Sequence, residues 1–203
     1  MPSICKILAV LQLDHNNSQI ATKIAIENPI ADSDTLHTFH DYIQMVMKKP
    51  TQYTGHKDLF KNLLRSVLEL RILLPPVYNF DPRYFVVNSE TKEVKIIISD
   101  ALFGRENTFL PTDSNKDVLA YLGPEELLGK EKQLTTPFWV VGVTMFQLQY
   151  ARHPFETHLK PRVMENLIKK YPVVFPDDVD SSKPAADADL KALLTGLLTK
   201  DPD

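Results

Sequence analysis

Carboxylates and imidazoles are the side chains in this sequence best suited to metal-dependent or acid–base chemistry. Asp100 follows the apolar run Val94–Ile98, and a carboxylate at the end of a strand can hold Mg²⁺ through one oxygen. The sequence favours the other interpretation of Asp100, a solvated loop residue. His37 and His40 lie three positions apart on a predicted helix and form a candidate bidentate pair, but no third ligand joins them, because Asp41 points elsewhere.

Other charged clusters are better explained by solvation than by chemistry. Asp177, Asp178 and Asp180 form an acidic run that predicts a solvated loop. Arg152–His153 and Lys160–Arg162 are small basic groups of the kind that keep a helix in contact with water. No serine is flanked by glycines in the pattern of a nucleophile elbow, so a serine hydrolase is not supported.

The composition is that of an ordinary globular protein of 203 residues, with 43% apolar and 24% charged residues. The net charge of −3 leaves no basic footprint for nucleic acid. No apolar run is long enough to span a bilayer, and the first residues lack the charged leader and cleavage site of a signal peptide. Cys5 is the only cysteine, which fits a reducing compartment. We therefore expect a cytoplasmic protein, with the nucleus as the other intracellular location.

Hydrophobic periodicity predicts strands at the start of the chain and helices further on. Two strands joined by a turn are expected over Ile4–Leu13 and Gln19–Ile26. A helix is expected over Asp34–Met47, with Asp34 as its N-cap, and the clearest helix covers Lys57–Ile72. Two short apolar runs, Phe85–Val87 and Val94–Ile98, flank a polar hairpin loop.

The second half of the chain reads as irregular structure followed by helices. Ala101–Asp117 is polar and irregular, and Phe138–Gln149 is apolar nearly all round, which predicts a buried helix. Arg162–Lys170 is predicted as a short helix, and Pro172–Pro176 as an extended segment. A last helix is expected over Asp189–Leu198. Its predicted core face comprises Leu190, Leu193, Leu194, Leu197 and Leu198.

The segment around the predicted buried helix has a distinctive spacing. Trp139 is followed three positions later by Gly142, and the segment closes on Pro154–Phe155. This pattern resembles the central helix of the large lobe of a eukaryotic protein kinase. In that family an aspartate two positions before the tryptophan holds the catalytic loop from below. Pro137 stands there instead, so the resemblance implies a catalytic loop that is either rearranged or mobile.

The order of the predicted elements is similar to that of a kinase large lobe from about Asp34 to Asp203. Pro172–Pro176 and Lys200–Pro202 are most similar to the calcium/calmodulin-dependent protein kinase kinase group. The resemblance implies an α+β fold, a mainly α-helical kinase large lobe with a short β remnant of the small lobe at the N-terminus. We expect one incomplete kinase-like domain over residues 1–203, with residues 1–30 as the strand remnant and residues 31–203 as the large lobe.

The resemblance also implies that the catalytic loop is degenerate. With Pro82 aligned to the family's proline, the replacements are Val77, Tyr78 and Asn79 for His-Arg-Asp, Asp81 for the lysine, and Tyr84 for the metal-binding asparagine. In the family the aspartate accepts the proton of the substrate hydroxyl, and the amide of Asn79 cannot act as that base. The phosphate-binding lysine and the second metal ligand are replaced as well.

Two further family motifs are present in altered form. Asp100 is the candidate for the metal-binding aspartate of Asp-Phe-Gly, although the usual loop length places that position on Ile98. Gly123, Pro124 and Glu125 resemble Ala-Pro-Glu. In the family this glutamate pairs with an arginine, and we expect Glu125 to be either solvated or paired differently. No glycine-rich loop or paired lysine precedes the first predicted strand, so we expect most of the upper wall of a nucleotide cleft to be absent.

Three functions remain open from the sequence. The favoured one is a truncated, degenerate kinase-like protein (a pseudokinase) that binds or scaffolds protein partners through its large-lobe surface. It would need no cofactor, nucleic acid or membrane, and a homodimer is one of its expected forms. The second is a divergent serine/threonine kinase, or an ATP-binding protein with weak phosphotransferase activity, that uses Asp100 to hold Mg²⁺ and Asp81 as the nearby carboxylate. The third is a fragment of a longer kinase without independent activity.

Overall fold

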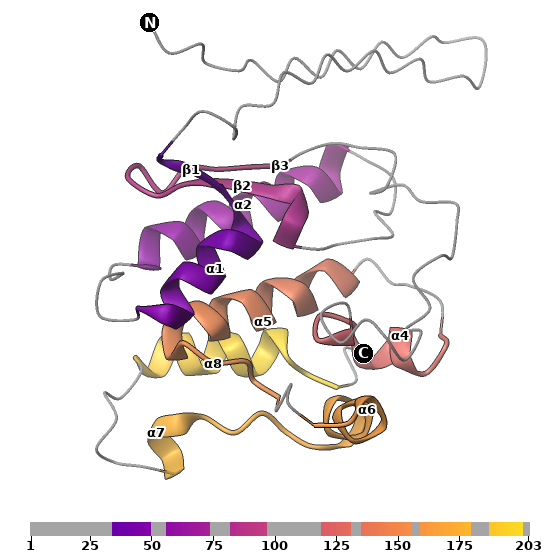
Figure 1. Ribbon diagram of the computed structural model, residues 1–203. Helices are drawn as coiled ribbons and strands as arrows, with labels where there is room; N and C mark the ends of the chain where they lie inside the picture. The colour runs from indigo at the N-terminus through magenta and orange to yellow at the C-terminus, as the bar shows by residue number, and fades with distance from the viewer. Residues whose placement is uncertain are drawn as a thin grey trace, which may run out of the picture.

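The computed structural model describes residues 34–49, 56–73, 82–96, 119–130, 135–155, 159–179 and 187–200. A small antiparallel sheet lies on one side of a stack of helices, and α5 runs through the middle of the stack (Figure 1). The elements are β1 (Leu36–Thr38), α1 (Phe39–Lys48), α2 (His56–Leu73), the 3₁₀ helix η2 (Pro82–Tyr84), β2 (Phe85–Asn88), β3 (Val94–Ile96), α4 (Pro124–Leu127), α5 (Thr136–Tyr150), α6 (Pro161–Lys170), α7 (Pro176–Val179) and α8 (Ala188–Leu197).

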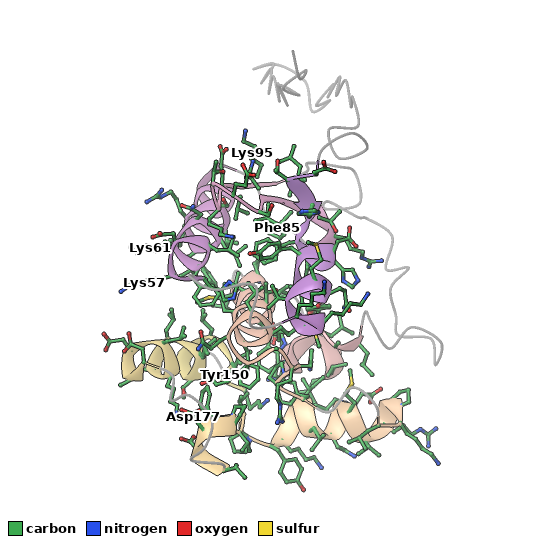
Figure 2. The ribbon with its side chains drawn as sticks, turned by 60° about the vertical axis from the view of Figure 1, so that its left-hand side comes forward. Lys57, Lys61, Phe85, Lys95, Tyr150 and Asp177 are labelled. Atoms are coloured by element: carbon green, nitrogen blue, oxygen red, sulfur yellow. The ribbon has the colours of Figure 1, made fainter. Side chains whose placement is uncertain are left out.

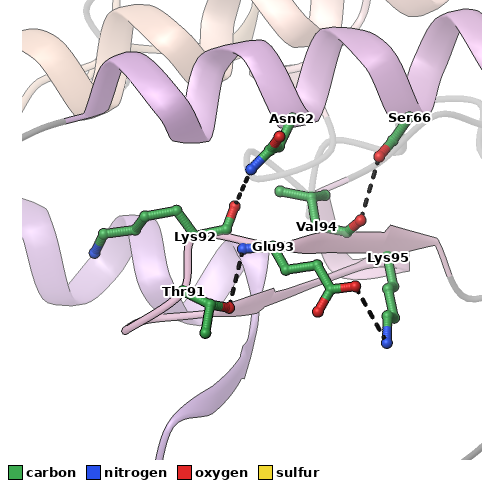
Figure 3. Close-up of polar contacts among 7 residues, drawn as sticks. All are labelled: Asn62, Ser66, Thr91, Lys92, Glu93, Val94 and Lys95. Atoms are coloured by element: carbon green, nitrogen blue, oxygen red, sulfur yellow. Dashed lines mark hydrogen bonds and ion pairs between the residues drawn. The ribbon is translucent and has the colours of Figure 1, made fainter.

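The predicted hairpin is confirmed, and β1 extends it to three strands in the order β1-β2-β3. Phe85 lies opposite Ile96 in the hairpin, and Leu36 of β1 lies opposite Asn88. Side chains of α2 bond to the hairpin backbone (Figure 3): the amide of Asn62 donates to the carbonyl of Lys92 at 2.8 Å, and the hydroxyl of Ser66 donates to the carbonyl of Val94 at 3.3 Å. The sheet is therefore fixed to the helical body through α2.

The start of α1 differs from the prediction. The helix begins at Phe39, and its N-cap is Thr38, whose hydroxyl accepts a hydrogen bond from the Asp41 backbone at 3.1 Å. The residues before it pair with β2 as a strand instead of forming the first turn of a helix from Asp34. His37 and His40 consequently lie on a strand and a helix, and the predicted same-helix pair is wrong. Within the described ranges, no group of three or more His, Cys, Asp or Glu side chains could hold a metal.

The predicted buried helix is confirmed as α5, and it forms the centre of the core. Its side chains are buried on every face from Trp139 to Leu148. The helices α1 and α2 pack against one side of it and α8 against the other. Since burying a Leu-, Val- or Phe-sized side chain is worth about 1.5–3 kcal/mol, the apolar side chains of this helix make a large contribution to the core.

The close approach of α5 and α8 depends on Gly142. A Cβ atom added at Gly142 would lie 2.9 Å from Cβ of Leu197 and 2.9 Å from a methyl carbon of Leu198. Because Cβ of Leu197 is fixed to the backbone of α8, a side chain at position 142 would force the two helices apart. The spacing of Trp139 and Gly142 thus has a packing explanation in this molecule.

The later elements agree with the prediction in outline and differ in two places. The helices α6 and α8 are confirmed, and Leu194 and Leu198 are buried as expected, but Leu193 is 39% exposed and does not belong to the core face. The predicted acidic loop begins instead with the short helix α7. The predicted strands before residue 30 and the irregular stretch Ala101–Asp117 lie outside the described residues. No helix in the described ranges has the length and hydropathy that crossing a membrane requires.

We predict that Gly142→Ala destabilises the fold. Crowding at the α5–α8 contact costs about 1–3 kcal/mol, which exceeds the ~1 kcal/mol of helix propensity that alanine adds. The matched control is Gly196→Ala in α8, where an added Cβ meets nothing within 4 Å and should stabilise the protein. Urea unfolding measures both: Gly142→Ala should lower the midpoint and Gly196→Ala should raise it. An unchanged midpoint for Gly142→Ala would contradict the packing argument.

Candidate functional site

The candidate catalytic positions belong mostly to segments outside the described residues. Val77, Tyr78, Asn79 and Asp81 fall between α2 and η2, and Asp100 falls after β3, so their geometry is not described. Tyr84 is the last residue of η2 and directly precedes β2. The structure thus describes α2 and η2, the elements on either side of the candidate catalytic loop. What the loop can do chemically is inferred from its residue types alone.

The described elements on either side of these segments enclose an apolar, tightly packed cluster. It is formed by α1, α2, η2, β2 and α5, and the space between them is too small to admit a water molecule. The residues that line it are Phe39, Leu63, Pro82, Phe85, Val140, Val141 and Thr144. Pro137 lies in the first turn of α5, where proline is well tolerated and carries no carboxylate.

Glu125 is buried and paired with a hydroxyl. Its side chain is 7% exposed, and Oε1 accepts a hydrogen bond from Thr136 in the first turn of α5 at 2.8 Å. The carboxylate also explains Gly123, because a Cβ added there would lie 2.7 Å from Oε2 of Glu125. Glu126 accepts a hydrogen bond from the backbone N–H of Gly123 at 3.0 Å, which is one half of a capping box, and glycine has no side chain for the other half. Glu125 was expected to be either solvated or paired with a group other than the family's arginine. The structure shows the second state, with Thr136 as the partner.

Trp139 lies in a stack of two aromatic rings and a lysine. Its indole packs parallel to Phe155, with ring centroids 5.9 Å apart and 7° between the planes. The ammonium of Lys200 lies 4.7 Å from the centre of the Trp139 ring and 4.2 Å from that of Phe155. Within the described part of the chain, neither Lys200 Nζ nor Trp139 Nε1 has a hydrogen-bond partner. Burial lowers the pKa of Lys200 to about 8, because the charged form loses hydration that the ring faces only partly replace.

His153 is buried between two backbone segments, not part of a basic surface. Its Nε2 lies 2.9 Å from the carbonyl oxygen of Ala120, and its Nδ1 lies 3.1 Å from the backbone nitrogen of Phe155. Nδ1 also lies 2.9 Å from the carbonyl oxygen of Phe155, so a neutral ring can donate to only one of the two carbonyls. Burial lowers the pKa of His153 to about 4, although the backbone bonds to Phe155 and Ala120 act in the opposite direction. The edge of Tyr121 packs against the same ring.

The predicted solvated acidic run is wrong for its first member. The side chain of Asp177 is 3% exposed and lies 2.7 Å from the ammonium of Lys191 in α8. Asp178 is bound by the same ammonium at 2.6 Å but is largely exposed, and Asp180 lies outside the described residues. Burial, followed by the charge of Asp177, raises the pKa of Tyr150 to about 12. Tyr150 and Asp177 lie close together beneath α5 in Figure 2, so this cluster joins the end of α5 to α7 and α8.

Sequence reasoning found Trp139, Gly142 and Glu125 from their spacing, but it missed their partners. Thr136, the partner of Glu125, lies three positions before Trp139 and belongs to no sequence motif that would mark it. Lys200 lies far along the chain from Trp139, and only tertiary packing brings the two together. No local pattern predicts such a contact.

Comparison with known proteins gives relatives that are serine/threonine protein kinases. Protein kinase PINOID of Oryza sativa is 34% identical over 82 residues, which is 40% of this chain and 16% of that protein. The yeast kinase YPK2/YKR2 is 36% identical over 91 residues, 45% of this chain and 12% of that protein. The mouse kinase ULK4 is 33% identical over 84 residues, 41% of this chain and 6% of that protein. No protein-family model matches the chain.

These similarities support a kinase-like domain in this chain. The matched stretch is under a fifth of the length of each of these three kinases. The helical body with a small three-stranded antiparallel sheet is compatible with a kinase-like α+β fold.

We predict that the acid sensitivity of the fold depends on His153. The folded-state pKa lies below the unfolded value of 6.5, so the unfolded chain takes up the proton first as the pH falls. Stability should therefore decrease between pH 6.5 and about 4, by on the order of 2–3 kcal/mol. His153→Gln removes this titration, and the variant should show a shallower loss in urea unfolding over that range. Equal slopes for parent and variant would contradict the assignment.

We predict a slope of the same sign at alkaline pH from Lys200. Its folded-state pKa is lowered to about 8 from 10.5, so the unfolded chain binds more protons between these values and stability should rise with pH from 8. Lys200→Met keeps the length of the side chain and should remove the rise in thermal unfolding between pH 7.5 and 9.5. Lys57→Met, on the exposed face of α2, is the matched loss of one lysine. If Lys57→Met also removed the rise in stability with pH, the contact of Lys200 with Trp139 and Phe155 would not be its cause.

Proposed function

We propose that this chain is a catalytically impaired kinase-like module that acts by binding protein partners on its helical surface. The observation that carries the proposal is the replacement of the catalytic base, the phosphate-binding lysine and a metal ligand by Asn79, Asp81 and Tyr84. Phosphoryl transfer depends on positioning and charge stabilisation by these groups. The packed helical core of the described residues supports a retained binding role, because that core is kept while these catalytic residue types are replaced.

The outer face of α6 is the favoured surface for a partner. Met164 and Ile168 hold the helix against the body, while Arg162, Val163 and Lys170 are exposed. A mixed face of cationic and apolar side chains suits a protein partner with acidic and apolar groups. The proposal includes a cytoplasmic location. It also includes membership of the calcium/calmodulin-dependent protein kinase kinase group, to which none of the names of the three kinases reported above refers.

Two alternatives follow from the same similarity. A divergent serine/threonine kinase or weak ATP-binding protein would need Asp100 as the metal ligand and Asp81 as the carboxylate near the substrate. A fragment of a longer kinase would fold without activity of its own, which agrees with the partial coverage of the relatives.

Thermal unfolding with and without nucleotide tests the proposal. A ligand at about 100 times its Kd stabilises a fold by about 2.7 kcal/mol, which raises Tm by a few degrees. We expect no shift with millimolar ATP and Mg²⁺ or Mn²⁺, and no phosphate transfer from labelled ATP to a generic acceptor. Transfer by the parent chain that disappears in Asp81→Asn/Asp100→Asn would establish the enzyme instead. Transfer that persists in the double variant would point to a contaminating kinase.

A further inference from the structure

One lysine of α8 gathers the charged side chains of the short helix α7. The ammonium of Lys191 lies 2.7 Å from Oδ2 of Asp177 and 2.6 Å from Oδ1 of Asp178. The same ammonium lies 5.5 Å from the centre of the Phe175 ring, directly before α7. The hydrogen bonds to the two carboxylates raise the pKa of Lys191 above its usual range. All of these contacts depend on one charge and are lost together if it is removed.

Within the described residues, little else attaches α7 to the body of the protein. None of its own residues is buried, and no extensive packing joins it to another described helix or strand. Val179, at its end, is 75% exposed. Lys191 belongs to α8, which packs on α5 and buries Leu194 completely. The ion pairs therefore connect a weakly attached element to a firmly attached one.

The buried carboxylate of Asp177 makes the position of α7 depend on the charge of Lys191. Its side chain is 3% exposed, and a carboxylate that stays buried after losing its cation is costly. Asp177 regains hydration when α7 moves away from α8. The side chain of Asp178 is 57% exposed, so water can hydrate it in its present position. Asp177 is thus the residue that converts a loss of charge into a movement.

The segment that leads into α7 lies over an aromatic cluster of α5. The ring of Phe175 has its centroid 5.9 Å from that of Phe146 and 6.0 Å from that of Tyr150. Val173 packs against the same core but is only partly buried. Since Phe175 precedes Asp177 by two residues, a movement of α7 also strains this contact. We call residues 173–179 the strap. In Figure 1 it runs from the end of α6 along the side of the molecule opposite the sheet.

We propose that Lys191 is a latch: its charge keeps the strap closed on α5 and α8, and removal of that charge opens the strap while the core stays folded. Acylation of the amine, or its capture by an acidic group of a partner, would operate the latch. Because the strap continues from α6, its opening would alter one end of the proposed partner surface. That consequence rests on the proposed function, whereas the latch itself does not.

The distance between two spin labels tests the position of the strap. In a Cys5→Ser background, Val179→Cys and Leu193→Cys place labels on α7 and α8 at sites that are 75% and 39% exposed. The parent chain should give a single narrow distribution of distances. Lys191→Gln, whose neutral amide stands for an acylated lysine, should shift the distribution to longer and more varied distances. Lys191→Arg keeps the charge and should give the distribution of the parent.

A control pair and a double variant separate the latch from a general loss of stability. Labels at Leu68→Cys in α2 and Leu193→Cys in α8 should keep one distance in every background, because the core does not open. Lys191→Gln/Asp177→Asn removes the buried carboxylate together with the cation, and the strap should close again.

Four results would overturn the latch. They are an unchanged strap distance in Lys191→Gln, an open strap in Lys191→Arg, an open strap in the double variant, and a changed distance for the control pair in Lys191→Gln. The response to ATP is measured separately by thermal unfolding. Nucleotide binding with phosphate transfer would overturn the proposed function and leave the latch in place, whereas an immobile strap without a response to ATP would do the reverse.

Discussion

The burial of α5 on all its faces is the constraint on which the rest of this structure depends. A helix without a polar face must be covered on every side, and this one is covered by α1 and α2 on one side and by α8 on the other. The helix α2 then holds the hairpin through Asn62 and Ser66, and α8 holds α7 through Lys191. Gly142 sets how closely α5 and α8 approach each other. A change at this position would therefore disturb the packing that connects the sheet, through α2 and α5, to α8 and α7.

Several buried polar groups of the described residues bond to one another instead of facing a ligand. Glu125 accepts from Thr136, Tyr121 donates to Gln147 at 3.1 Å, and His153 lies between two backbone segments. Paired in this way, such groups stabilise the fold, because an unpaired buried polar group is costly.

The sequence predicted the elements whose signal is local and missed those that depend on distant partners. Periodicity was sufficient for α2, α5 and α6, and two β-branched runs around a polar loop were sufficient for the hairpin. The start of α1 could not be predicted, because Asp34 and Thr38 are both good caps and only the pairing of β1 with β2 selects Thr38. The burial of Asp177 depends likewise on Lys191 in another helix. At the candidate site, Trp139 and Gly142 were found from spacing, whereas Lys200 became visible only in three dimensions.

Proline lies in the first turn of α4, α5 and α6, and it opens α7. A proline has no amide hydrogen, so each of these helix starts has one donor fewer for a bound anion, at the end of a helix where phosphate groups commonly bind. Each such proline also restricts the unfolded chain, which favours the folded state by about 0.4–1 kcal/mol where the backbone already suits it. These helix starts therefore favour a firm frame over the capture of phosphate.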